Sequence, residues 1–311
     1  DGEDPWVVVD EVFKDDAAHP EVAPRPTEML RKVWAALPGN RRDLLKLVSR
    51  FDLTIDQAAR MYVDTERAKA RIEDSDHELL TNPYRLYEAD RFSPDAIALT
   101  AIDRGVFPVP KIRERFPLSS PSAVDDALDE RRVRALTISE LENAADNGHS
   151  LQARSSIVQA IRERALDPPC PLTTDIVAVA EANFGTEVVV TTMADGATAY
   201  QLNRLADCRR KIATLVRKRA GARRLPVDAD WPGVIDSLLG ASAEDDPDEA
   251  LARAEKAAAL EVLAKSRISV LIGPAGTGKT TLLRALCSVP EVAQRGVLLL
   301  APTGKARVRR Q

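Results

Sequence analysis

Hydrophobic residues recur at three- and four-residue spacing through most of the chain, which is the spacing of one face of an α-helix. From residue 26 to residue 184, the segments with this spacing are bounded by caps or breakers such as Pro38-Gly39, Thr54 and Ser93. We expect helices at residues 27–37, 41–51, 55–63, 94–104, 122–147, 155–166 and 174–184. This part of the chain is therefore predicted to be mainly helical.

A β-branched run at residues 187–192 changes the pattern and predicts a strand, which should end in the turn Ala194-Asp195-Gly196. A long helix is expected to follow, from about residue 200 to residue 220. One stripe of this helix is apolar and consists of Leu202, Leu205, Ile212, Leu215 and Val216.

Helices and short apolar runs alternate in the last part of the chain. We predict a helix at 250–265, a strand at 268–272, a helix at 280–287 and a strand at 296–300. Two strands joined by a crossover helix form a right-handed parallel unit. A parallel sheet needs more strands than two, and helices over both of its faces. The predicted fold class is therefore α/β overall, with a helical region followed by the start of a parallel sheet.

The acidic segment 244–249, which contains Pro247, is typical of a linker. This linker is the best predicted domain boundary in the chain. Four parts are predicted in all. These are an acidic N-terminal arm at 1–25, a helical region at 26–185, a strand with a basic helix and the acidic linker at 186–249, and an incomplete parallel-sheet domain at 250–311.

The composition is that of an ordinary soluble protein, with 44% hydrophobic and 30% charged residues. A formal net charge of -4 gives no global attraction to nucleic acid, so any such site must be a local patch. The cysteines Cys170, Cys208 and Cys287 are too few and too scattered for a disulfide framework or a zinc site. No apolar run reaches membrane-spanning length, and we expect a cytoplasmic protein without a membrane partner.

A glycine-rich motif between the strand at 268–272 and the following helix carries the clearest chemistry. It reads Gly273-x-x-x-x-Gly278-Lys279-Thr280, which is the phosphate-binding loop pattern called Walker A. Glycines allow consecutive N–H groups to turn inward around an anion, and the helix start adds its positive dipole. The predicted nucleotide-binding residues are Gly273, Pro274, Ala275, Gly276, Thr277, Gly278, Lys279, Thr280 and Thr281.

Two residues of this loop have predicted catalytic roles. Lys279 should reach the β and γ phosphates of ATP, and the Thr280 hydroxyl should be a ligand of the Mg²⁺ that bridges them. The expected cofactors are therefore ATP and Mg²⁺. An apolar run at 6–9 followed by Asp10-Glu11 resembles the second, metal-holding motif of nucleotide hydrolases. That motif normally follows the phosphate-binding loop, whereas this run precedes it, so we interpret the run as a short strand or packing arm.

Basic residues are concentrated in the long helix after the predicted strand. Between residues 204 and 224 the only acid is Asp207, against the cations Arg204, Arg209, Arg210, Lys211, Arg217, Lys218, Arg219, Arg223 and Arg224. This excess is compatible with contact to a phosphate backbone, and equally with a solvated helix face.

The segment Ala301-Pro-Thr-Gly-Lys-Ala306 follows the second predicted strand. Together with the Walker A loop it resembles motifs I and Ia of superfamily 1 DNA helicases, specifically the RecD-like group. The resemblance implies a RecA-like motor domain that hydrolyses ATP and moves 5′ to 3′ along single-stranded DNA. It also implies that the DNA-binding residues are Pro302, Thr303, Gly304 and Lys305, with single-stranded or partly duplex DNA as the partner.

A weaker resemblance lies upstream, where Asn82-Pro83-Tyr84 and Asp103-Arg104-Gly105 are similar to the helix-hairpin-helix region of longer RecD-like proteins. In such units the turn N–H groups bind nucleic-acid phosphates. The hydrophobic pattern is also that of an ordinary helical bundle, and both interpretations stay open.

The sequence departs from the family in two respects. Glu255 stands where the family usually has an adenine-reading Gln, and an ionised carboxylate can only accept hydrogen bonds. In addition, neither a Walker B Asp-Glu nor an arginine finger follows the loop, which indicates an N-terminal piece of a longer helicase, inactive by itself. The alternatives are a different P-loop ATPase, such as an AAA-type machine, and a DNA-binding or partner-docking module with an incomplete nucleotide fold.

Overall fold

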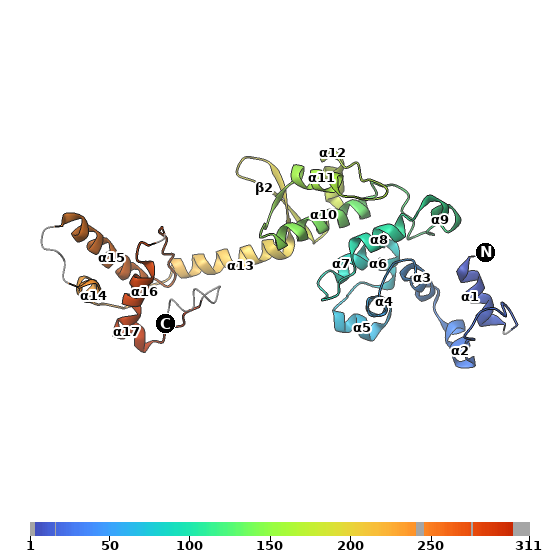
Figure 1. The fold of residues 1–311 in the computed structure, drawn as a ribbon, viewed down its shortest axis with the longest axis horizontal. Helices are drawn as coiled ribbons and strands as arrows, with labels where there is room; N and C mark the ends of the chain where they lie inside the picture. The colour runs from blue at the N-terminus through green and yellow to red at the C-terminus, as the bar shows by residue number, and fades with distance from the viewer. Residues whose placement is uncertain (1–3, 16, 241–245, 275, 301–311) are drawn as a thin grey trace. The chain divides into compact units, whose positions relative to one another are not determined.

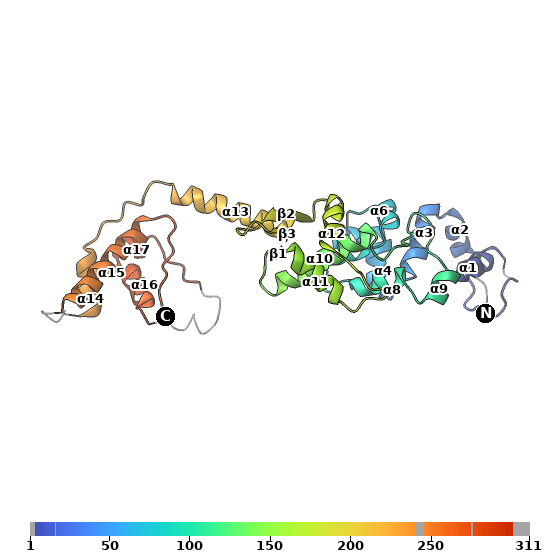
Figure 2. The same ribbon diagram turned by 90° about the horizontal axis from the view of Figure 1, so that it is seen from above.

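The computed structural model describes residues 4–15, 17–240, 246–274 and 276–300. Two compact units are present, Asp1–Ala206 and Asp207–Gln311. Both units are dominated by helices, and the assigned strands lie in the first unit (Figures 1 and 2). The chain is thus mostly helical with a small sheet, and the domain limits drawn from the sequence stay a prediction.

The first unit confirms helices near five of the predicted positions, namely α2, α3, α4, α11 and α12. Its helices are α1 (Pro5–Lys14), α2 (Glu28–Ala36), α3 (Gly39–Val48), α4 (Ile55–Tyr62), α5 (Asp64–Ala70), α6 (Asp76–Thr81), α7 (Arg85–Asp90), α8 (Leu99–Val106), α9 (Pro110–Arg115), α10 (Glu130–Asp146), α11 (Arg154–Glu163), α12 (Thr174–Ala180) and the 3-10 helix η1 (Glu181–Asn183). A helix-hairpin-helix arrangement among them stays a prediction.

The sheet of the first unit is antiparallel with strand order β1-β3-β2, from β1 (Gln152–Ala153), β2 (Val188–Thr192) and β3 (Thr198–Leu202). The predicted strand and its turn are confirmed, and Gly196 adopts a φ of +86° in the turn. The expected helix begins later than predicted, as α13 (Asn203–Ala220), because Tyr200 pairs with Val190 in the sheet and is fully buried.

A buried ion pair joins α8 to α10 in the core of the first unit. The Arg132 guanidinium, with no solvent exposure, donates to both carboxylate oxygens of Asp103 at 2.8 Å. The Tyr84 hydroxyl donates to the same carboxylate at 2.7 Å, and burial raises the pKa of this hydroxyl. Arg132 also lies over the Phe107 ring, 4.6 Å from its centroid. Three elements are therefore fixed around one carboxylate.

Two similar pairs connect other helices. Arg134 on α10 donates to both oxygens of Glu88 on α7, and Arg60 on α4 donates to both oxygens of Asp90. Asp90 also accepts the Ile97 N–H at 2.8 Å. This bond holds the loop before α8, so α8 begins at Leu99 and the helix predicted from residue 94 is wrong in its first turn.

The helix predicted at residues 122–147 is likewise shorter, because α10 begins at Glu130. The Asp129 carboxylate accepts the Arg131 N–H at 2.9 Å and caps the helix at that point. The preceding residues 122–129 form a loop instead. A capping residue inside an apolar-periodic segment therefore decided where the helix starts.

Of the two structures expected for residues 6–9, a short strand or a packing arm, the strand is wrong, since these residues belong to the helix α1. Asp4 caps the helix, and Trp6 stacks on Trp34 with ring centroids 6.3 Å apart. Asp10 accepts the Trp34 indole N–H at 3.0 Å, while Glu11 lies 2.6 Å from a ring nitrogen of His19. These contacts account for Asp10 and Glu11 without a metal ion.

The second unit has a smaller core between α14 (Trp231–Leu239), α15 (Pro247–Lys265), α16 (Lys279–Ser288) and α17 (Pro290–Gln294). Trp231, Leu260 and Leu282 are buried together there. Arg253 on α15 donates to Asp236 and to the Gly240 carbonyl, and this ties α15 to α14. Of the acidic linker predicted at 244–249, Asp246 caps α15 and residues 247–249 form the first turn of that helix, while 244 and 245 lie outside the described residues.

The two strands predicted in the second unit are not assigned as strands in the described residues 268–272 and 296–300. Most of their side chains are exposed, including Ile272 at 85% and Leu298 at 82%, whereas Leu271 is half-buried against the core of the unit. A strand forms by hydrogen bonding to a neighbour, and a parallel sheet in addition requires cover on both faces. No ladder with a neighbouring strand is assigned in the described residues of this unit, so the parallel sheet predicted from the sequence is not formed there.

Two further features of the described residues are the apolar length of the helices and the state of the Cys170 thiol. None of the helices in the described ranges combines the length and the apolar composition that a membrane span requires. Cys170 is buried, and this burial raises the pKa of its thiol, which reduces the reactive thiolate.

We predict that Asp103→Ala lowers the free energy of unfolding by about 3 to 5 kcal/mol, because it leaves the Arg132 guanidinium buried without its counterion. Urea unfolding followed by far-UV circular dichroism measures the change. Asp125→Ala is the matched control, since Asp125 is exposed and should change stability by less than about 0.5 kcal/mol. Equal stability of the two variants would contradict the role given to the buried pair.

Candidate functional site

The glycine-rich loop before α16 has two residues in the left-handed region of backbone conformation. Gly276 has a φ of +85° and Gly278 a φ of +80°. Only glycine adopts such angles without a steric cost from a Cβ atom. The loop geometry therefore depends on the residue type at these two motif positions.

Gly278 is also the N-cap of α16, and no side chain caps this helix end. The first helical hydrogen bond runs from the Leu282 N–H to the Gly278 carbonyl at 2.9 Å. The preceding N–H groups, those of Lys279, Thr280 and Thr281, have no acceptor within the helix. They add to the positive end of the helix dipole, which is an anion-binding arrangement.

The Lys279 side chain folds back over the loop. Its Nζ donates to the Gly273 carbonyl at 2.6 Å and to the Pro274 carbonyl. The Thr277 hydroxyl donates to the same Pro274 carbonyl at 3.0 Å. The loop thus holds the Lys279 ammonium group against its own carbonyl oxygens.

Gly273 needs to be small for a different reason. A Cβ atom there would lie 3.1 Å from the Thr277 hydroxyl and 3.9 Å from the Lys279 Nζ. The glycine thereby leaves room for the two side chains that cross the loop. The sequence motif identified Gly273, but it carried no signal for the carbonyl contacts made by Lys279.

The metal ligand predicted from the sequence is Thr280, which is exposed at the start of α16. Its hydroxyl is therefore accessible to a Mg²⁺ ion held by nucleotide phosphates. In the described residues, no group of three or more His, Cys, Asp or Glu side chains is arranged to hold a metal ion. Any Mg²⁺ at this loop would need oxygens of the nucleotide as further ligands.

The helix behind the loop is anchored in the core of the second unit. Leu282 and Ala285 on α16 are buried against α14 and α15. These contacts fix the helix start, and with it the N–H groups of the loop. Glu255, at the position of the expected adenine-reading Gln, is exposed on α15.

Several predicted residues lie outside the described residues. These are Ala275 of the loop and the predicted DNA-binding residues Pro302, Thr303, Gly304 and Lys305. The basic helix predicted from the sequence is present as α13, and its cations Arg209, Arg210 and Lys211 are exposed. Within the predicted apolar stripe, Ile212, Leu215 and Val216 are exposed, whereas Leu202 is buried in β3 and Leu205 is half-buried against the core of the first unit.

Comparison with known proteins gives a match over part of the chain. Residues 250–309 match the family model of an AAA domain. AAA domains of this kind are P-loop ATPase domains, so the match indicates nucleotide binding, usually together with Mg²⁺. No curated protein matches the chain.

We predict that Gly278→Ala weakens binding of a fluorescent ATP analogue roughly tenfold, because a left-handed backbone costs a residue with a Cβ about 1–2 kcal/mol. Fluorescence titration in the presence of Mg²⁺ measures the affinity. Gly39→Ala is the matched control, since an added Cβ at Gly39 would meet open space and its φ is not left-handed. Unchanged affinity in the Gly278 variant would show that the loop conformation is not required.

Proposed function

We propose that the chain is the N-terminal part of a RecD-like, superfamily 1 DNA helicase, which couples ATP hydrolysis to 5′ to 3′ movement along single-stranded DNA. The observation that carries the proposal is the glycine loop, with its two left-handed residues and its lysine, at the start of a core-anchored helix. The AAA domain match over 250–309 includes this loop and extends through the segment similar to motif Ia.

The nucleotide-binding residues of the proposal each have a defined task. N–H groups of the loop and of the α16 start surround the phosphates, and Gly276 and Gly278 permit this backbone path. Lys279 exchanges its carbonyl contacts for the β and γ phosphates, and the Thr280 hydroxyl binds Mg²⁺. When bound, Mg²⁺ neutralises charge that develops on the phosphates during transfer.

The DNA contacts of the proposal follow from the similarity to motif Ia. Pro302, Thr303 and Gly304 provide a small turn with exposed N–H groups, and Lys305 provides a cation beside it. The basic helix α13 is a second candidate contact, because its cations outnumber its acids.

Two alternative functions differ from this proposal in what they require. Another P-loop ATPase would use the loop in the same way but has no need for DNA contacts at 302–305. A DNA-binding or partner-docking module would bind DNA without any role for Lys279. Measurements that separate nucleotide binding from DNA binding therefore distinguish the three.

We predict that Lys305→Ala weakens binding of a labelled oligothymidylate and makes the slope of log affinity against log salt less negative by about 0.7, the effect of one lost phosphate contact on a single strand. Fluorescence anisotropy at several salt concentrations measures both quantities. Arg295→Ala is the control, because Arg295 is an exposed cation ten residues before Lys305 in the sequence. A slope equal to that of the control would favour a P-loop ATPase that does not act on DNA.

We predict that a polypeptide of residues 1–311 binds ATP with Mg²⁺ but shows essentially no turnover. After Thr280 the only acid in this polypeptide is Glu291, whose carboxylate accepts the Asp228 N–H at 3.4 Å. Groups that stabilise transition-state charge contribute orders of magnitude in rate. A coupled phosphate-release assay measures turnover, and nucleotide binding should be lost in Lys279→Ala. Steady hydrolysis that disappears in Lys279→Ala would overturn the predicted inactivity.

A further inference from the structure

A cleft of about 790 Å³ lies in the first unit and is separate from the glycine loop. We call it the α1–α9 cleft; its walls come from α1, α3, the end of α8, α9 and the segment 116–122. Its volume lies within the range of pockets that hold small organic ligands. The hydrophobic pattern does not predict this cleft, because the elements that form it are far apart along the chain.

The α1–α9 cleft is lined by more cations than acids. Lys46, Arg50, Arg104 and Arg115 face it, against Asp4 and Asp43. Asp4 is already engaged, since its carboxylate accepts the Trp6 N–H as the cap of α1. The cleft therefore has a local positive excess in a chain whose net charge is negative.

These cations differ from the other arginines of the first unit. Arg60, Arg132 and Arg134 are each bound to a carboxylate. In the described part of the chain, Lys46, Arg104 and Arg115 make no ion pair, and Arg50 donates to the Phe116 carbonyl at 2.8 Å instead of to an acid. Unpaired cations gathered on one concave surface are available to an anionic ligand.

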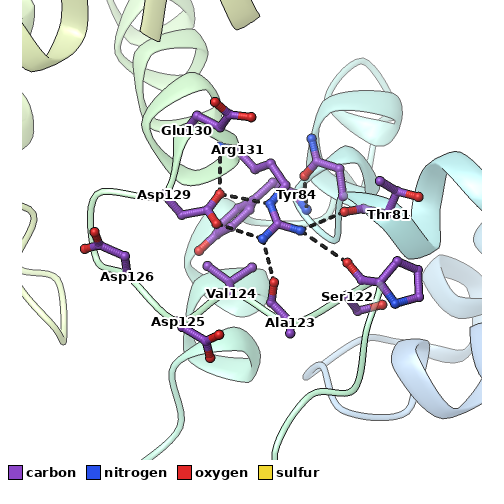
Figure 3. Close-up of polar contacts among 12 residues, drawn as sticks. Thr81, Tyr84, Ser122, Ala123, Val124, Asp125, Asp126, Asp129, Glu130 and Arg131 are labelled. Carbon is purple, nitrogen blue, oxygen red and sulfur yellow. Dashed lines mark hydrogen bonds and ion pairs between the residues drawn. The ribbon is translucent and has the colours of Figure 1, made fainter. Parts of the chain in front are cut away.

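The wall formed by segment 116–122 is held by hydrogen bonds to neighbouring residues. Arg131 donates to the carbonyls of Thr81, Pro121 and Ala123, and Asp129 fixes its guanidinium (Figure 3). The Ser122 hydroxyl donates to the Leu80 carbonyl at 2.6 Å. Ser119 and Ser120 are thereby presented on an ordered wall, where hydroxyl groups can donate to phosphate oxygens.

An aromatic ring completes the lining. Trp6 faces the cleft and stacks in parallel on Trp34 behind it, with an interplanar angle of 3°. A supported aromatic ring beside cations is the arrangement on which single-stranded nucleic acids stack a base while their phosphates meet the charges. The carboxylates of an acidic peptide would pair with the cations, but such a peptide has no base that would stack on the Trp6 ring.

We propose that the α1–α9 cleft binds a short stretch of single-stranded nucleic acid, with phosphates at Arg104, Arg115 and Lys46 and a base against Trp6. The proposal rests on the proposed function only for the kind of partner. It shares no residue with the glycine loop or with 302–305, so the two can fail separately.

The test uses Arg104→Glu/Arg115→Glu in the whole chain, with a labelled oligothymidylate as the probe. Anisotropy should show affinity reduced roughly tenfold and a salt slope less negative by about 1.4, since two phosphate contacts are lost. Lys111→Glu/Arg162→Glu is the matched control, because both residues are exposed and neither lines the cleft. It changes the net charge equally and should retain the wild-type slope.

A second readout locates the bound strand. An oligonucleotide that carries 5-iodouracil should, on irradiation, crosslink to the peptide that contains Trp6, and this crosslink should be lost in the double variant. Lys279→Ala should leave both readouts unchanged, which separates this proposal from nucleotide binding. Arg104→Gln/Arg115→Gln removes the same two positive charges without introducing negative ones. It should show the same change in salt slope, also in the case that the Glu variant does not fold.

Three results would overturn the proposal. The first is a salt slope in both cleft variants equal to that of the control. The second is a crosslink confined to residues 207–311. The third is binding of labelled polyglutamate that depends on Arg104 and Arg115 while oligothymidylate binding does not, which would assign the cleft to an acidic peptide.

Discussion

A guanidinium group removed from water is costly unless acceptors are paired with it, and in the first unit the most buried guanidinium groups are paired with carboxylates. Asp103 fixes Arg132 and Tyr84, Glu88 fixes Arg134, and Asp90 fixes Arg60 together with the loop that leads into α8. These pairs join α4, α7, α8 and α10, elements that local helix propensity alone would leave unconnected. The chain has only 4% aromatic residues, but Tyr84, Phe184 and Tyr200 are among its largest fully buried side chains.

Cations near the core of the first unit that make no such pair are therefore exceptions, and they are candidates for binding an anionic ligand. Most arginines near the core of the first unit bind a carboxylate or a backbone carbonyl, whereas Arg104 and Arg115 lie on one cleft without such a partner in the described residues. In the second unit the ammonium group of Lys279 is held by two loop carbonyls above a helix start. Both places offer positive charge on a preorganised backbone, and both suit phosphate groups.

The two units differ in how closely the sequence predicted them. Helices with a clear cap, such as α2 after Thr27 and α4 after Thr54, were predicted to within a few residues, because their signal is local. Boundaries at α8 and α10 were misplaced, because Asp90 and Asp129 set them through hydrogen bonds that periodicity does not reveal. The run at 6–9 was expected to be a short strand or a packing arm; it is helical, and its Trp6 packs on Trp34 of α2.

The sequence by itself determined the glycine loop, because left-handed backbone at Gly276 and Gly278 and the lysine after them are properties of residue type and spacing. It also determined most helices, whose apolar faces repeat within a few residues. Tertiary structure decided the rest. Strands at 268–272 and 296–300 depend on pairing with neighbouring strands and not only on their own apolar composition, and no strand is assigned in the described residues of their unit. The positive charge of the α1–α9 cleft depends on which cations pair with carboxylates elsewhere. Such pairing joins residues, for example Asp103 and Arg132, that are distant in sequence but adjacent in space.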